Sequence, residues 1–365
     1  MTILRDAATS ILGSKTLAAL TSPHGVDRYL EQINPMWAAT EVRARVVSVT
    51  RETSGEHPVA TLTLQPTSTW RGHRAGQYVQ VGVQVPGARR TTRCFSISSA
   101  ESGPGESFTL TVRAHEEGRV SKFLVRQARA GEIVHLSQAQ GEFTLTESPA
   151  TPSNNHLLMI SGGSGITPVM SHVRTLLRDG YAGHANRKVT FLHYARSAED
   201  QIFALELARI AREDNGITVH LRHGAEHFSA ESLAELVPDF CDTDTWACGP
   251  APMMALVTEA YGDSPRLRTE FFKAPAASSG SAEGQVSFSR AGASATNSGA
   301  SLLEQAEALG LTPEFGCRMG ICFSCTSRKT EGTVRNVLTG EESSLPDEDI
   351  RICVSAPVGD CTVDL

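Results

Sequence analysis

The stretch Cys317-Arg318-Met319-Gly320-Ile321-Cys322-Phe323-Ser324-Cys325 places three cysteines in one short segment, and Cys353 follows further along the chain. Two irons bridged by two sulfides need four thiolates, and the spacing C-x4-C-x2-C with a distant fourth cysteine supplies three of them from one tight loop. Glycines in such a loop allow backbone amides to approach the sulfur atoms. The sequence therefore predicts a [2Fe–2S] cluster bound by Cys317, Cys322, Cys325 and Cys353.

Other uses of these cysteines stay open at this point. A structural zinc site prefers two short Cys-x2-Cys pairs, whereas this segment contains one. Disulfides are disfavoured in a reducing compartment. Cys361 competes with Cys353 as the fourth ligand. The segment Ile352-Cys353-Val354-Ser355 resembles the closing motif of the plant-type ferredoxin family, so the resemblance favours Cys353 and leaves Cys361 as a small core residue.

Length and composition set outer limits on the rest. A chain of 365 residues with 40% hydrophobic and 20% charged residues is expected to form two or three globular domains. A net charge of −7 argues against nucleic acid as the main partner. No stretch is apolar enough to span a bilayer, and no signal peptide is recognised. We therefore expect a cytoplasmic protein that is peripheral to a membrane only through its partner.

From Val42 onward, short runs alternate apolar and polar residues between polar turns, a pattern typical of half-buried strands. The runs are Val42–Val49, Ala60–Leu64, Tyr78–Val81, Phe108–Val112 and Ile133–Leu136. Strands at this spacing over about a hundred residues predict one small antiparallel β-barrel.

After Pro152 the pattern changes to strands followed by helices, which predicts a parallel sheet covered by helices. The apolar strand Leu157–Ile160 runs into Gly162-Gly163-Ser164-Gly165-Ile166-Thr167-Pro168 and then a helical segment. A glycine-rich turn at a helix start lets backbone amides approach a pyrophosphate. A plain strand-to-helix turn is the alternative interpretation of this stretch.

Arg93-Cys94-Phe95-Ser96 resembles the R-x-Y-S flavin motif of the ferredoxin-NADP reductase superfamily, and the resemblance extends over residues 41–273. Members of this superfamily pair a flavin-binding barrel with a nicotinamide-binding domain. The resemblance implies that Arg93 contacts a flavin phosphate, Phe95 packs on the isoalloxazine ring and Ser96 hydrogen-bonds near N5. Phe95 lacks the hydroxyl of the family's tyrosine, and a role in the barrel core would also suit it.

Gly118-Arg119-Val120-Ser121 resembles the second flavin motif, G-x-x-S, which holds the pyrophosphate at a helix start. The resemblance implies that Gly118, Val120 and Ser121 bind the cofactor, and the two motifs together favour FAD over FMN. An FMN phosphate could instead meet Arg119. Ser121 could equally be an ordinary N-cap before Lys122–Gln127.

Cys248-Gly249-Pro250 resembles the family's C-G-P turn beside the nicotinamide, and Glu270-Phe271 resembles the segment that places an acid and an aromatic against the flavin. A buried structural thiol is the alternative for Cys248. The resemblance implies catalytic roles for Ser96, Cys248 and Glu270. It further implies that the nucleotide and flavin are contacted by Gly163, Gly165, Thr167, Pro168, Gly249, Pro250 and Phe271.

The residues after the second strand of the nucleotide domain bear on the choice between NADPH and NADH. An acid at this position binds the ribose 2′-hydroxyl of NADH, and an arginine accommodates the 2′-phosphate of NADPH. Arg196 and Ser197 stand here and predict NADPH, while Glu199 and Asp200 close behind keep NADH open.

Together these features predict a multidomain fold. The expected parts are a helical extension over 1–40, an antiparallel FAD-binding β-barrel over 41–147, an α/β NAD(P)H-binding domain with a parallel sheet over 148–273, a flexible linker over 274–284 and a β-grasp [2Fe–2S] ferredoxin domain over 285–365.

This order of domains predicts an oxidoreductase in which electrons pass from NADPH to FAD, then to the cluster and on to an external oxygenase. Asp27-Arg28-Tyr29-Leu30 and Asn34-Pro35-Met36-Trp37 resemble bacterial electron-transfer partners of acyl-CoA desaturases and di-iron hydroxylases, which implies a membrane-bound acceptor. A soluble Rieske-type or CoA-ester oxygenase is the alternative. A redox-sensing or scaffold protein without sustained turnover is the alternative from another functional class.

Overall fold

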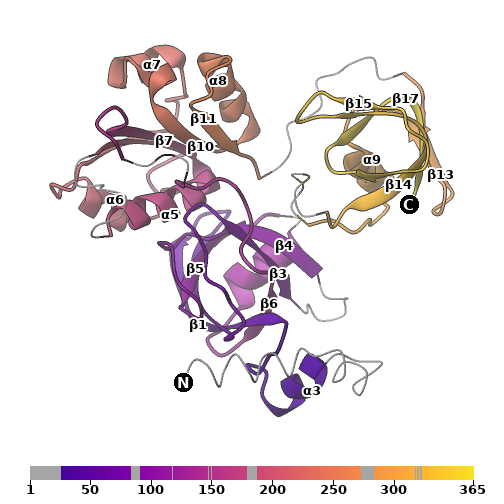
Figure 1. Cartoon of the computed structure of the whole chain (residues 1–365), viewed down its shortest axis with the longest axis horizontal. Coiled ribbons are helices and arrows are strands. Elements are labelled where there is room, and N and C mark those ends of the chain that lie inside the picture. The colour runs from indigo at the N-terminus through magenta and orange to yellow at the C-terminus, as the bar shows by residue number, and fades with distance from the viewer. Residues whose placement is uncertain are drawn as a thin grey trace. The chain divides into compact units, whose positions relative to one another are not determined.

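The computed structural model describes residues 26–83, 91–116, 118–146, 148, 150–178, 187–272, 283–316, 318, 320 and 323–365 (Figure 1). They fall into two compact units. The first runs to Cys248 and resumes over Leu256–Thr269, and the second holds Gly249–Ala255 and Glu270–Leu365. Among these residues, no helix combines the length and hydropathy that crossing a bilayer requires. The predicted linker over 274–284 falls almost wholly outside the described residues.

The first unit begins with the predicted antiparallel barrel. Its strands run in the order β4-β3-β6-β1-β2-β5, and a bridge between Ile97 and Leu110 joins its two edges. Along β2, Ala60, Leu62 and Leu64 point into the core, as the alternating sequence pattern predicts. The strands are β1 (Val42–Thr53), β2 (Val59–Pro66), β3 (Tyr78–Val83), β4 (Thr91–Ser96), β5 (Phe108–Arg113) and β6 (Ile133–Leu136).

A short helix, α3 (Val26–Ile33), is anchored to this barrel by one carboxylate. Asp27 accepts hydrogen bonds from the backbone amides of Ala39, Thr40 and Glu41 and from the Thr40 hydroxyl. Beneath it lies the fully buried guanidinium of Arg43, which donates to the Trp37 carbonyl at 3.0 Å. Burial alone would raise the pKa of Asp27, but these hydrogen bonds lower it below its ordinary value.

The nucleotide domain follows, lies within the same unit except for Gly249–Ala255 and Glu270, and is built on the predicted parallel sheet. Strand order is β11-β10-β7-β8-β9, with β10, β7, β8 and β9 parallel. Helices α5 and α6 cover one face and α7 the other (Figure 1). The elements are β7 (His156–Gly162), α5 (Ile166–Leu176), β8 (Lys188–Ala195), α6 (Ala204–Ile210), β9 (Ile217–His223), α7 (Ala230–Leu236), β10 (Asp244–Cys248), α8 (Ala251–Tyr261) and β11 (Leu267–Glu270).

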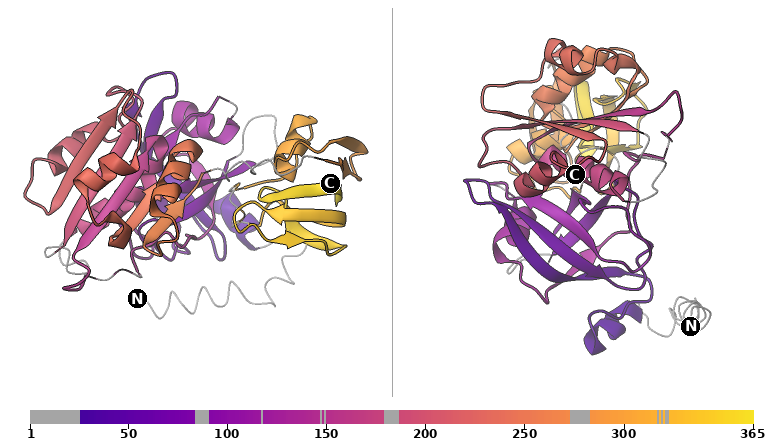
Figure 2. Two further views of the ribbon diagram at one scale, coloured as in Figure 1. Left: turned by 90° about the horizontal axis from the view of Figure 1, so that it is seen from above. Right: turned by 90° about the vertical axis from the view of Figure 1, so that its left-hand side faces the viewer.

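Helix α5 lies between the parallel sheet and the barrel (Figures 1 and 2). The Ser171 hydroxyl donates to the Ser99 carbonyl at 2.6 Å, and the Thr175 hydroxyl accepts from the Glu101 amide at 2.9 Å. Arg174 donates to the Ser98 carbonyl and pairs with Glu206 of α6. These bonds join the helix that follows the glycine turn to the segment that follows strand β4.

The second unit contains a mixed sheet in the order β13-β12-β17-β14-β15, with β16 paired to β14 and helix α9 packed on the sheet. Strands β12 and β17 are parallel, as in the predicted β-grasp fold. The elements are β12 (Gln285–Phe288), β13 (Ala293–Thr296), α9 (Leu302–Ala308), β14 (Thr326–Asn336), β15 (Glu342–Ser343), β16 (Glu348–Arg351) and β17 (Ser355–Asp364).

A buried histidine at the contact between α5 and the barrel generates a pH prediction. His172 is fully buried, its Nε2–H donates to the Phe143 carbonyl at 2.8 Å, and burial lowers its pKa to about 4. The unfolded chain therefore binds this proton more readily. The stability contributed by neutral His172 is complete above about pH 6.5 and is lost as the pH falls toward 4, by about 3 kcal/mol in total.

We expect His172→Gln, which keeps a side-chain donor but does not titrate, to flatten the fall in the free energy of unfolding between pH 7 and pH 5. Urea unfolding followed by tryptophan fluorescence measures this change. Equal pH slopes for the variant and the natural chain would contradict the assignment.

Candidate functional site

Strand β4 forms an open wall of the barrel. Its residues Thr91–Phe95 are each half-buried, whereas five of the six residues of the neighbouring β3 are buried. Arg93 and Phe95 lie on the same face because side chains two apart in a strand do so. Phe95 packs part of its ring against the barrel core, and Ser96 is buried at the strand end. The uncovered face fits a flat aromatic cofactor better than a fully packed core.

The second predicted flavin segment is a tight turn leading into a helix. Helix α4 (Arg119–Lys122) has Gly118 as its N-cap and continues into a π-helical turn over Phe123–Gln127. Ser121 therefore lies inside the helix, and its interpretation as an N-cap was wrong. Its hydroxyl instead donates to the Gly118 carbonyl at 3.2 Å and accepts from the His115 amide at 3.3 Å. A Cβ on Gly118 would lie 2.3 Å from this hydroxyl, so a larger residue there would require the Ser121 side chain to rotate away. Val120 is buried in the barrel core.

The glycine turn after β7 adopts the conformation that its sequence suggests. Gly163 has φ +54°, a 3-10 turn spans Gly163–Gly165, and α5 begins at Ile166. The Thr167 hydroxyl donates to the Ser164 carbonyl at 3.0 Å, and Pro168 sits in the first helical turn, where its missing N–H costs nothing. The strand, turn and helix N-terminus form an arrangement suited to a phosphate group.

Two arginines lie near this turn, and sequence reasoning identified only one of them. Arg196, at the end of β8, contacts Asp200 at 3.6 Å, and the Ser197 hydroxyl accepts from the Asp200 amide. Arg113, at the end of β5, places Nη1 3.7 Å from where a Cβ on Gly163 would stand. Burial and then the charge of Arg196 lower the pKa of Arg113, so the two guanidinium groups are close. Arg113 stands five residues before Gly118, where the second flavin motif begins, and this position was the available signal.

The remaining predicted residues of the nucleotide site lie at strand ends. Cys248 is fully buried at the end of β10 and is paired in register with Ser161 of β7, which leads into the glycine turn. Glu270 is buried at the end of β11, and Phe271 is half-buried after it. Gly249 and Pro250 precede α8, where the Pro250 carbonyl accepts from the Met254 amide.

Two of the four predicted cluster ligands can be placed, while Cys317 and Cys322 lie outside the described residues. Cys325 and Cys353 are both buried in the core of the second unit, and the Ile352 amide donates to the Cys325 carbonyl at 3.3 Å. This bond brings the segments of both cysteines together. Two buried cysteines on segments joined by this bond fit a thiolate-bound cluster.

The loop over residues 316–325, here called the cluster loop, has three described residues in the left-handed backbone region. They are Arg318, Gly320 and Phe323, with φ of +58°, +74° and +57°. A Cβ on Gly320 would lie 2.7 Å from the side chain of Val354, which follows Cys353. The loop can approach the Cys353 segment this closely only because residue 320 is glycine.

Cys361 occupies a different environment from the predicted ligands. It lies on β17 between Val286 of β12 and Gly332 of β14, and burial raises the pKa of its thiol to about 11. The described cysteines form no disulfide.

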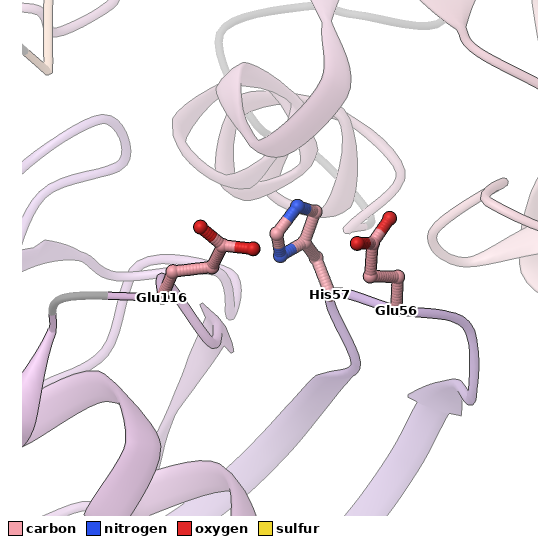
Figure 3. A group of neighbouring side chains, drawn as sticks. All are labelled: Glu56, His57 and Glu116. Atoms are coloured by element: carbon pink, nitrogen blue, oxygen red, sulfur yellow. The ribbon is translucent and has the colours of Figure 1, made fainter.

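A separate group of possible ligands lies on the barrel surface. Glu56, His57 and Glu116 place one ligand atom each within 4.8 Å of one another, and their side chains converge from two loops (Figure 3). Both carboxylates are exposed to solvent. Exposed carboxylates of this kind are common as solvated surface groups, and their oxygen and nitrogen donors differ from a thiolate set.

Comparison with known families assigns a description to each part of the chain. Residues 45–145 match the family described as oxidoreductase FAD-binding domain, and residues 159–259 match oxidoreductase NAD-binding domain. Residues 290–358 match the 2Fe-2S iron-sulfur cluster binding domain. The chain thus carries FAD-binding, NAD-binding and cluster-binding domains in the predicted order.

Two curated relatives and one solved structure resemble nearly the whole chain. An NADPH oxidoreductase of Mycobacterium tuberculosis is 37% identical, covering 96% of this chain and 91% of the relative. A glycine betaine monooxygenase reductase subunit of Pseudomonas aeruginosa is 30% identical, covering 91% and 98%. The structure of phthalate dioxygenase reductase shares the fold, with a TM-score of 0.57 at 22% identity, covering 89% of this chain and 98% of that one.

The close approach at Gly320 generates a test with a matched control. Gly320→Ala places a methyl group against Val354, whereas Gly310, with a similar φ of +79°, has nothing within 4 Å of its Cβ position. We expect Gly320→Ala to lose most of the visible absorbance of the cluster, while Gly310→Ala keeps it. Equal iron and sulfide content in both variants would contradict a role for this contact.

Proposed function

The chain belongs to the family of oxidoreductases that join FAD-binding, NAD-binding and 2Fe-2S cluster-binding domains, and we propose that it delivers electrons from NADPH to a membrane-bound di-iron acyl desaturase or hydroxylase. The presence of the three domains in one chain carries the proposal. Bound FAD converts a two-electron donor into single electrons, and a bound [2Fe–2S] cluster carries one electron at a time. The residues of this chain hold, orient and shield these groups.

In this proposal the open wall of β4 holds the flavin. Phe95 supplies a half-exposed ring for stacking, Arg93 on the same face supplies a charge for a phosphate, and Ser96 supplies a hydroxyl at the strand end. The Gly118 turn, with Val120 and Ser121, holds the pyrophosphate. Cys248, buried at the end of β10, excludes water from the nicotinamide, and the carboxylate of Glu270 can hold a proton.

The nucleotide is held by the turn from Gly163 to Pro168 and by the arginines beside it. Arg196 and Ser197 meet the 2′-phosphate of NADPH, and Arg113 places a second positive charge near the glycine turn. The pairing of Arg196 with Asp200 is long and solvent-exposed, so a dianionic phosphate can replace it at small cost. The name of the mycobacterial relative, an NADPH oxidoreductase, agrees with this preference.

Replacing Arg196 tests the choice of nucleotide. Arg196→Ala should lower kcat/KM for NADPH by about 10- to 100-fold, since it removes a charge-assisted bond to phosphate, and should leave NADH within about threefold. Arg209→Ala is the control, because Arg209 is also exposed and pairs with an acid four residues on. Steady-state ferricyanide reduction with each nucleotide measures the effect, and an equal loss with both nucleotides would refute the assignment.

The cluster ligands proposed are Cys317, Cys322, Cys325 and Cys353. Cys361 stays a core residue, because it is buried within the sheet between strands β12 and β14. In the second unit, Gly320 of the cluster loop packs closely against Val354, which follows Cys353. We therefore expect the loop and the Cys353 segment to bind the same cluster.

Residues 26–41, here called the arm, support a membrane-bound acceptor over other choices. Asp27 ties α3 to the barrel, so Tyr29, Ile33 and Trp37 are presented to solvent on a fixed element. Exposed aromatic and aliphatic side chains gathered on one short segment are typical of an interaction surface. Tyr29 and Trp37 also belong to the segments that resemble the electron-transfer partners of acyl-CoA desaturases.

A soluble Rieske-type oxygenase is the second candidate acceptor. It is favoured by the relatives, since the Pseudomonas protein is a reductase subunit of glycine betaine monooxygenase. The two candidates make different demands on the arm: a soluble oxygenase needs no apolar contact with a membrane.

Reconstitution distinguishes the two acceptors. With NADPH and an acyl-CoA, the purified chain should support product formation by a membrane-bound desaturase in proteoliposomes, and Cys353→Ser, which lacks a cluster ligand, should support none. A soluble Rieske-type oxygenase with its own substrate is assayed in parallel. Turnover of that oxygenase with no desaturase product would exclude the membrane acceptor.

A further inference from the structure

Phe323 lies in the cluster loop with most of its ring in solvent. Its exposed fraction is 64%, whereas Phe288, in the same unit, is completely buried. Exposed apolar residues are common on protein surfaces and by themselves indicate nothing. The position of Phe323 is less ordinary, because it follows one predicted cluster ligand, Cys322, and precedes another, Cys325.

The exposed ring of Phe323 stands on a backbone in the left-handed conformation. Phe323 has φ +57°, a conformation that bulky residues rarely adopt. The turn is fixed by Thr326, whose amide and hydroxyl donate to the Phe323 carbonyl at 3.1 and 2.7 Å. A left-handed phenylalanine costs free energy that a glycine or asparagine at this position would avoid. The loop therefore keeps an aromatic ring at a position where the backbone disfavours one.

Arg351 supports the ring from the protein side. Its guanidinium carbon lies 4.9 Å from the centre of the Phe323 ring, and its Nη1 donates to the Gly320 carbonyl. Arg351 ends strand β16 and pairs in register with Thr326 of β14. One side chain thus contacts both the exposed ring and the backbone of the cluster loop, and it acts as a positioning residue for Phe323.

The stretch of sequence that contains Phe323, residues 285–365, has a strongly negative net charge. Residues 285–365 contain eleven acids and six bases, an excess of five negative charges. Five of the bases form ion pairs with carboxylates, and the sixth, Arg351, contacts Phe323. The pairs are Arg290–Asp364, Arg318–Glu307, Arg328–Asp349, Lys329–Glu348 and Arg335–Glu342. An excess of this size attracts a basic partner at long range.

We propose that Phe323 is the anchor through which this segment docks its electron acceptor, and that the acceptor presents an apolar recess on a surface with a net positive charge. Charges guide the encounter, while a central aromatic contact supplies most of the binding energy. The inference rests on the proposed electron-transfer function but not on the identity of the acceptor. It assigns the contact to the loop between two predicted ligands, where the path for an electron is short.

The test compares Phe323→Asn with Leu345→Asn. Asparagine tolerates the left-handed backbone at position 323, and Leu345 is an equally exposed apolar residue of the same unit, at 65%. The probe is ferricytochrome c, a basic protein with an exposed haem edge. We expect Phe323→Asn to raise KM for cytochrome c about tenfold with kcat little changed, and to weaken its binding to the oxidised protein in calorimetry to the same extent.

Two controls separate docking from damage to the cofactors. The electron paramagnetic resonance signal of the reduced cluster gives the cluster content, and NADPH-driven ferricyanide reduction reports on the flavin. Both are expected to match the natural chain in Phe323→Asn and Leu345→Asn. Phe323→His, which also tolerates the backbone, serves as a second substitution if the first lowers the cluster content, and Phe323→Tyr should restore the natural KM.

The proposal is overturned if the variants at 323 and 345 bind and reduce cytochrome c equally well with intact clusters, or if Phe323→Tyr is as impaired as Phe323→Asn. Its failure can be told apart from that of the proposed function. Loss of docking without any stimulation of a desaturase would reject the acceptor but keep Phe323 as the anchor. Stimulation of the desaturase that is undiminished in Phe323→Asn would keep the acceptor but reject Phe323 as the anchor.

Discussion

The attachment of helix α5 to the barrel is the interaction on which the first unit depends. The helix begins at the glycine turn, and its Ser171, Arg174 and Thr175 bond to the segment that follows strand β4. Gly76 makes this approach possible, since a Cβ there would lie 1.8 Å from the Phe143 carbonyl. The surfaces proposed to hold nucleotide and flavin are therefore fixed to each other by short bonds rather than by a long loop.

In the second unit the corresponding constraint is the backbone of the cluster loop, which must turn tightly while part of it stays exposed. Residues with left-handed backbone conformations allow the loop to turn tightly. Cation–π contacts from Arg318 to Phe315 and from Arg351 to Phe323 stabilise it. Each arginine also bonds within the unit, to Glu307 or to the Gly320 carbonyl.

The sequence was sufficient for those features that depend on local pattern. Alternation predicted the barrel strands, and Leu157–Pro168 predicted the strand, glycine turn and helix, because these signals are contained within a few residues. Arg113 and Arg174 were not found, since their importance comes from neighbours brought close by the fold. The alternative interpretation of Ser121 as an N-cap was wrong because the helix starts at Arg119, three residues before Lys122. Which cysteines bind the cluster stays a prediction.

The buried pair of Asp27 and Arg43 has a consequence for the modularity of the chain. The sequence pattern places a boundary between the arm and the barrel at residue 41. Arg43 of the barrel is nevertheless fully buried and forms ion pairs with Asp27 and Glu31 of the arm. A barrel severed at that point would keep an interior guanidinium without these counter-charges, at a cost of several kcal/mol. Arm and barrel therefore form one cooperative block, so exchanging the barrel between reductases requires exchanging the arm with it.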